Sequence, residues 1–89
     1  MNWFKEVFLN SFDICNGKRI SEKQAGIFRK YFDIIDCKIE EWEQFNAYYE
    51  KYKFDNLIYI IQESIVGYGK NKWIEYYLTI KEEEDLFNE

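Results

Sequence analysis

Few residues of this chain carry groups that could catalyse a reaction. The 89-residue sequence has no histidine and two cysteines. Histidine is the usual general base and the commonest metal ligand, so its absence excludes Ser-His and Cys-His nucleophiles and histidine-based zinc sites. Cys15 and Cys37 are too far apart in sequence to form a CxxC motif. We therefore expect no catalytic residue, no cofactor and no metal site.

The carboxylates gather in two runs. Glu40, Glu41 and Glu43 form the first run, and residues 82–85 form the second. A glycosidase needs two carboxylates across a cleft, one with a raised pKa. A calcium loop needs the pattern D-x-[DN]-x-[DN]-G, which is absent. These acids are either solvated surface or pair with Lys and Arg of a partner.

Two further motifs resemble nucleotide or nucleic-acid sites. Gly67-Tyr68-Gly69-Lys70 lacks the GxxxxGK[ST] spacing of a phosphate-binding loop, so we interpret it as a hairpin turn whose exposed tip could be a contact point. A helix-turn-helix DNA reader needs a basic recognition helix. The basic residues of the expected helices fit a solvated face better than such a reader: Lys18, Arg19, Lys23, Arg29 and Lys30.

Aromatic residues are the most abundant contact groups. The chain has eight Tyr, eight Phe and three Trp, and Tyr and Trp are enriched at protein interfaces. Either many tyrosines sit half-exposed at the edge of the core, or several aromatics form a recognition patch. Trp42 lies among acids and Trp73 lies beside the turn, although either could instead be a core residue. The predicted partner-binding residues are Glu40, Glu41, Trp42, Glu43, Tyr68 and Trp73.

The elements that must position these residues begin with two expected helices. Apolar residues recur every three or four positions over residues 2–15, and Asn16-Gly17 is a helix stop. Ser21 and Gln24 match a capping box that begins a second helix. Its buried stripe comprises Ala25, Phe28, Phe32 and Ile35. A short connection between the helices predicts an αα-hairpin.

The second half of the chain predicts strands. Residues 37–54 fit a helix or a strand, and we favour a strand over residues 48–54. Strands follow over residues 57–66 and 72–80, and the face with Ile74, Leu78 and Ile80 should meet the helices. The expected fold is α+β, an N-terminal αα-hairpin packed on a small antiparallel β-sheet of two or three strands. Residues 1–80 should form one domain, with an acidic tail over 81–89.

Net charge and the absence of targeting signals indicate the kind of partner and the cellular location that we expect. The net charge is −5, with +1 over residues 1–36 and −6 over residues 37–89. An acidic half disfavours binding to a phosphate backbone and suits a basic partner. No apolar run marks a signal peptide or a membrane helix. We expect a cytoplasmic protein with reduced cysteines as small core residues; a single disulfide is the alternative.

The overall profile resembles small phage-encoded inhibitor proteins of the anti-CRISPR and anti-defence type. The shared features are a short, acidic, aromatic-rich chain with frequent Asn, Lys, Ile and Tyr, and a helix start over residues 17–24. No family motif is matched residue by residue, so no family site is carried over. The resemblance implies stoichiometric binding to a host nuclease or effector, in the host cytoplasm.

Three functions therefore stay open. The first is a non-enzymatic inhibitor or adaptor that docks on a host protein with a basic surface through acidic and aromatic residues. The second is a homo-oligomeric structural or assembly subunit, as a homodimer for example. The third is a nucleic-acid-binding regulator that uses the basic helix pair, although the acidic charge makes direct nucleic-acid binding the weaker hypothesis.

Overall fold

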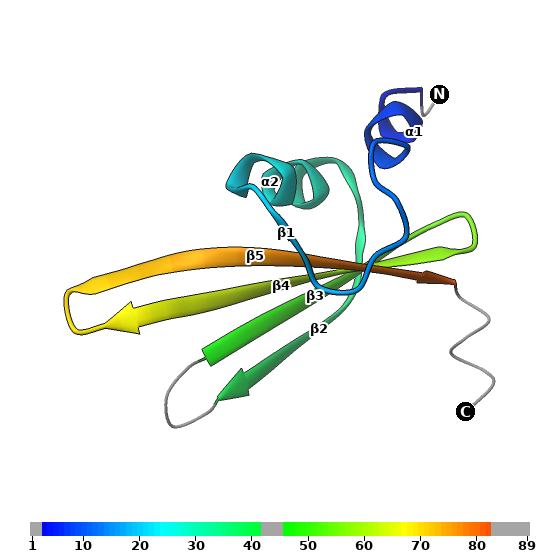
Figure 1. The fold of residues 1–89 in the computed structure, drawn as a ribbon. Helices are drawn as coiled ribbons and strands as arrows, with labels where there is room; N and C mark the ends of the chain where they lie inside the picture. The colour runs from blue at the N-terminus through cyan, green and yellow to red at the C-terminus, as the bar shows by residue number, and fades with distance from the viewer. Residues whose placement is uncertain (1–2, 42–45, 83–89) are drawn as a thin grey trace.

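The computed structural model describes residues 3–41 and 46–82 (Figure 1). Two short helices and five strands follow one another in the order α1 (Trp3–Leu9), β1 (Lys18–Ile20), α2 (Glu22–Tyr31), β2 (Ile34–Glu41), β3 (Asn46–Phe54), β4 (Leu57–Tyr68) and β5 (Asn71–Glu82).

All five strands form one antiparallel sheet with the order β1-β5-β4-β3-β2. Strands β2 to β5 are a meander, because each pairs with the next along the chain. Strand β1 comes from the N-terminal part and pairs with β5 on its outer side, over three residues only. Both helices lie on the same face of the sheet (Figure 1), which we call the helix-bearing face.

The expected αα-hairpin on two or three strands is wrong. The protein is mostly β, with five strands and two short helices. Residues 18–20, expected to be a loop between two helices, form β1 and send the chain across the sheet edge before α2 begins. The two helices are therefore not a hairpin but separate elements that both pack on the sheet.

The first helix is shorter than the apolar spacing predicted. Helix α1 ends at Leu9, and the chain then approaches β5. The amide of Ile80 donates to the carbonyl of Cys15 at 2.9 Å, and the amide of Gly17 donates to Oγ1 of Thr79 at 3.0 Å. These long-range bonds join residues 15 and 17 to β5, and Gly17 has a positive φ of 75°, so the helix cannot continue to them.

Helix α2 begins where the sequence predicts. Ser21 Oγ accepts from the Gln24 amide at 3.1 Å, and Gln24 Oε1 accepts from the Ser21 amide at 2.9 Å, which confirms the capping box. The helix ends at Tyr31, and Phe32 is already extended. Residues 37–54, whose sequence fits a helix or a strand, lie in strands wherever the structure describes them, since β2 covers 34–41 and β3 covers 46–54.

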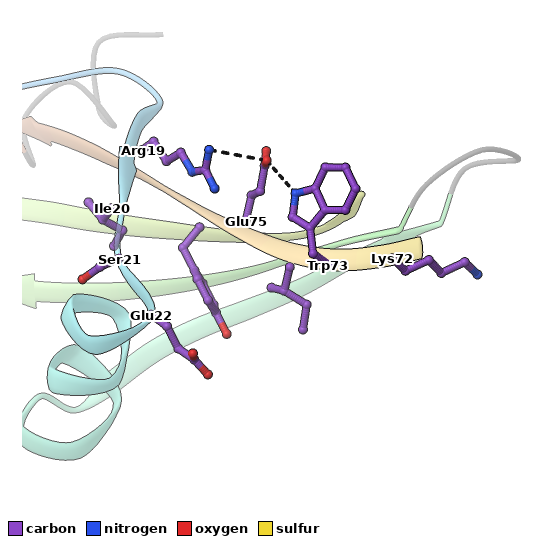
Figure 2. A pocket seen from close by; sticks show the side chains of 9 residues that line it. Arg19, Ile20, Ser21, Glu22, Lys72, Trp73 and Glu75 are labelled. Atoms are coloured by element: carbon purple, nitrogen blue, oxygen red, sulfur yellow. Dashed lines mark hydrogen bonds and ion pairs between the residues drawn. The ribbon is translucent and has the colours of Figure 1, made fainter. Parts of the chain in front are cut away.

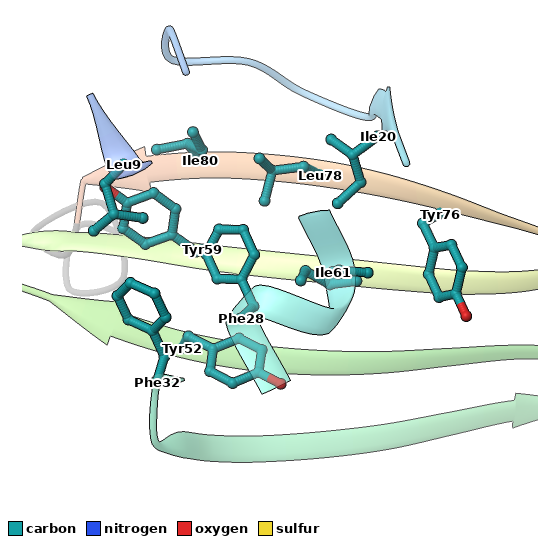
Figure 3. Packing of buried hydrophobic residues seen from close by; sticks show 11 residues of the cluster. Leu9, Ile20, Phe28, Phe32, Tyr52, Tyr59, Ile61, Tyr76, Leu78 and Ile80 are labelled. Atoms are coloured by element: carbon teal, nitrogen blue, oxygen red, sulfur yellow. The ribbon is translucent and has the colours of Figure 1, made fainter. Parts of the chain in front are cut away.

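Phe28 is the centre of the hydrophobic core (Figure 3). Its side chain is fully buried, and its ring contacts five other aromatic rings at centroid distances of 5.1 to 6.1 Å. Leu78 and Ile80 of β5 lie in the same cluster, which confirms the predicted helix-facing side for these two residues, whereas Ile74 is exposed. Much of the aromatic content is thus core packing, and burial of these rings is the main source of stability. The five rings around Phe28 are those of Phe8, Phe12, Phe32, Tyr52 and Tyr59.

The cysteines differ in environment. Both are free thiols, so the alternative of a disulfide is not realised. Cys15 is partly buried and packs against the core, as expected. Cys37 is exposed on β2, so its prediction as a core residue is wrong.

Candidate functional site

The structure brings together two of the six predicted contact residues. Tyr68 and Trp73 lie at the turn between β4 and β5, where the Tyr68 side chain is 87% exposed and that of Trp73 is 50% exposed. Glu40 and Glu41 belong to β2, and two strands, β3 and β4, lie between β2 and β5. The remaining two predictions, Trp42 and Glu43, lie outside the described residues.

Two glycines shape the turn that carries these aromatics. Gly69 has φ of 57°, a value that a two-residue hairpin loop of type II′ requires at its first position. Gly67 has φ of 108°, and a Cβ atom there would overlap the carbonyl oxygen of Asn71. The strands approach closely and stay paired up to Tyr68 and Asn71, so Tyr68 lies at the end of a closely paired hairpin.

Apolar residues surround this hairpin end on both faces of the sheet. Ile65 and Ile74 are cross-strand partners on the helix-bearing face, and both are exposed. Trp73 and Val66 are partners on the opposite, open face. The strands extend beyond α2 here (Figure 1), so the helix does not cover them. We call Ile65, Tyr68, Trp73 and Ile74 the distal patch.

Hydrogen bonds hold Trp73 in position (Figure 2). Its indole Nε1 donates to Oε2 of Glu75 at 2.8 Å, and the hydroxyl of Tyr77 donates to the other carboxylate oxygen. Arg19 from β1 adds an ion pair to Glu75 at 3.5 Å. The two hydrogen bonds, aided by the Arg19 charge, lower the pKa of Glu75 below its ordinary value. A half-exposed tryptophan fixed in this way is pre-organised for contact, because little side-chain freedom remains to be lost.

A hollow of about 640 Å³ adjoins the distal patch. It lies where β1 ends, beside the first half of β5 (Figure 2). Its lining combines polar and apolar groups from β1, the start of α2 and β5, and comprises Arg19, Ile20, Ser21, Glu22, Lys72, Trp73, Ile74, Glu75 and Tyr76.

The strongest polar cluster was missed by the sequence analysis. Arg29 was expected on a solvated basic face, but its Nε donates to Glu50 at 2.6 Å and its Nη2 donates to Glu63 at 2.8 Å. Burial opposes the charged form of Arg29, yet these two bonds and charges outweigh it and raise its pKa. The signal was in the sequence: Glu50 alternates with Tyr48 and Tyr52 on one side of β3, and an acid among core-facing residues requires a partner.

The engagement of Arg29 weakens the nucleic-acid hypothesis. A recognition helix would present its cations to a groove, whereas this arginine lies over the ring of Tyr76 and binds two carboxylates of the sheet. The basic helix pair on which that hypothesis depends is not formed. Within residues 3–41 and 46–82, no cluster of three or more His, Cys, Asp or Glu could hold a metal ion.

The helices in the described residues are all too short or too polar to cross a membrane. Comparisons with protein-family models, with curated proteins and with solved structures find no match to this chain.

Proposed function

We propose that this chain is a non-enzymatic protein-binding module that docks through the distal patch. The observation that carries the proposal is Trp73, half-exposed yet held by Glu75 beside the exposed Tyr68. Binding energy in protein interfaces concentrates in a few aromatic anchors with a pre-organised geometry. Ile65 and Ile74, on the helix-bearing face of the same hairpin end, supply apolar surface that a partner enclosing this end would remove from water.

The partner we propose is a host protein with a basic surface, and the effect of binding is inhibition. The net charge of −5 supports such a partner, because opposite charges accelerate encounter. A nucleic-acid-handling defence effector, such as a CRISPR nuclease, has the basic surface that this requires. This choice rests on charge and on the resemblance of the sequence profile, and it places the protein in the host cytoplasm.

Affinity capture followed by binding kinetics tests the proposal. Wild-type protein and Trp73→Ala are each used to capture proteins from host lysate, and the captured partner is then measured by surface plasmon resonance. We expect Trp73→Ala to raise Kd about tenfold or more, mainly through faster dissociation. Raised salt should slow association of the wild type.

Trp3 provides a matched control on the other side of the molecule. Its side chain is also largely exposed, on α1, so Trp3→Ala removes the same chemistry away from the distal patch. It should leave Kd unchanged. Equal binding by wild type and a folded Trp73→Ala variant would refute the distal patch as the docking surface.

The homo-oligomeric alternative has a separate test. The outer strand β2 exposes Ile34, Ile35 and Ile39, which would suit self-association. Sedimentation velocity over a range of protein concentrations would show a concentration-dependent mass if this alternative were correct, and a constant monomer mass if it were not.

A further inference from the structure

We propose that an extended segment of the partner adds to the sheet as a sixth strand beside residues 72–75 of β5. This inference rests on the proposed function and specifies how the partner binds. In strand addition, backbone hydrogen bonds give affinity and alternate side chains give specificity.

The backbone of β5 is directed for this pairing. The Ile80 amide donates to the Cys15 carbonyl, and the Leu78 carbonyl accepts from the Cys15 thiol. Both bonds lie on the side of β5 that faces β1. Successive residues of a strand point their backbone groups to opposite sides, and the pairing of β4 with β5 is regular along its whole length. The amides and carbonyls of Lys72 and Ile74 therefore point to this same side.

No described strand pairs with that part of the edge. Strand β1 pairs with Tyr76, Tyr77 and Leu78 only, and the chain then turns away because Ser21 caps α2. The hollow of about 640 Å³ occupies the position that a longer β1 would fill. A row of backbone donors and acceptors without a strand beside it is a template for another chain.

The opposite edge of the sheet is protected, which makes the β5 edge the better template. Strand β2 has a register shift between Ile34 and Asp36, and the Asp36 carboxylate accepts from the amide of Cys37 at 2.9 Å. Bulges and charged residues are the usual means by which proteins prevent pairing at an edge. Residues 72–75 include the charged Lys72 and Glu75, but their pairing with β4 has no register shift.

The chemistry of the hollow indicates which segment fits. Arg19 contacts Glu75 at the long distance of 3.5 Å and its side chain is 64% exposed, so most of its donors face solvent. It lies on the open face, where a carboxylate of the incoming strand would complement its charge. On the helix-bearing face, the exposed side chain of Ile74 offers apolar surface. The segment should therefore alternate apolar residues with an Asp or Glu, as a local acidic stretch of a partner whose surface is otherwise basic.

Selection from a display library of random linear peptides tests the inference on the full chain. We expect enriched peptides to alternate apolar and acidic residues. On binding, the amide protons of Lys72 and Ile74 should exchange about tenfold more slowly with solvent, as measured by NMR. Arg19→Gln should weaken binding of the acidic peptides.

A proline variant isolates the backbone bond. Lys72→Pro removes one edge amide, and proline is tolerated at edge positions whose amide faces solvent. Lys72→Ala is the matched control, since it removes the charge but keeps the amide. Lys72→Pro should reduce peptide affinity below that of Lys72→Ala by about fivefold or more, for one lost hydrogen bond. If Lys72→Pro does not fold, protection of the Lys72 amide in the wild type on peptide binding tests the same backbone hydrogen bond.

The other possible results of these experiments would each contradict the inference. Failure to enrich any peptide, or binding that leaves both amides unprotected, would overturn strand addition. Loss of partner binding in Trp73→Ala would still support the proposed function in that case, so the two can fail separately. If a rise in protein concentration alone protects the same amides from exchange, the added strand comes from a second copy of this chain. The proposal of a partner segment would then be wrong.

Discussion

The Nε of Arg29 donates to Oε1 of Glu50 across 2.6 Å, joining α2 to the centre of the sheet. The Glu50 side chain is 9% exposed, and Arg29 is the cation that it contacts. Glu63 accepts the second bond from Arg29 and lies on the next strand. One cation thus orients the helix over two strands and balances two neighbouring carboxylates.

Removing this arginine should destabilise the protein. Arg29→Met leaves Glu50 and Glu63 close together without a cation, and one of the carboxylates is nearly buried. The free energy of unfolding should fall by about 2 kcal/mol, below the range for fully buried pairs because Arg29 is partly open to water. Urea denaturation measures it. Lys23→Met, an exposed change on the same helix, should stay near the wild-type value, and equal midpoints for both variants would contradict the role of the cluster.

The Ser21 cap of α2 should also contribute measurably to the free energy of unfolding. Ser21→Ala removes the acceptor for the Gln24 amide and should cost about 1 kcal/mol of unfolding free energy. Ser21→Gly is the informative comparison, because glycine at a cap costs only a few tenths of a kcal/mol. An unchanged denaturation midpoint for Ser21→Ala would show that the capping bond adds nothing to stability.

The elements predicted correctly are those whose signals are local. The Ser21 cap is contained in four residues, and the strand pair around Gly67 and Gly69 is defined by its own turn. β1 could not be found this way, because three residues carry no periodicity and its pairing with Tyr76 to Leu78 is long-range. A short strand of this kind is specified by the sheet, not by its own sequence.

β2 was hidden for a different reason. Ile35 continues the helical spacing of Ala25, Phe28 and Phe32, so the buried stripe seemed to run past the true end of α2. As an edge strand whose side chains from Ile34 to Ile39 are exposed, β2 lacks the alternation that a half-buried strand shows. At the candidate site, Tyr68 and Trp73 were recognisable beside a turn, but the hollow was not, since it depends on where β1 stops.

Two glycines should respond in opposite directions to alanine. Gly26 lies inside α2 with open space around its Cα, so Gly26→Ala should raise the unfolding free energy by about 1 kcal/mol through helix propensity. Gly67→Ala should lower it by more than about 2 kcal/mol, because the new Cβ meets the Asn71 carbonyl at a positive φ. Thermal melts of both variants measure this, and a shift of the same sign for both would contradict the turn geometry.

Tyrosine ionisation should set the alkaline limit of stability. Burial, reinforced by the charge of Glu50, raises the pKa of Tyr52, and burial likewise raises the pKa of Tyr59 and Tyr76. A group whose pKa is higher in the folded state contributes stability that is complete below its unfolded pKa, near 10 for tyrosine, and is lost as pH rises further. The unfolding free energy should therefore fall steeply above about pH 10. Tyr52→Phe should make that fall shallower, whereas Tyr68→Phe, which removes an exposed hydroxyl, should not. Urea denaturation between about pH 8 and 11 measures both slopes, and identical slopes for wild type and Tyr52→Phe would show that the Tyr52 hydroxyl does not need its proton in the folded state.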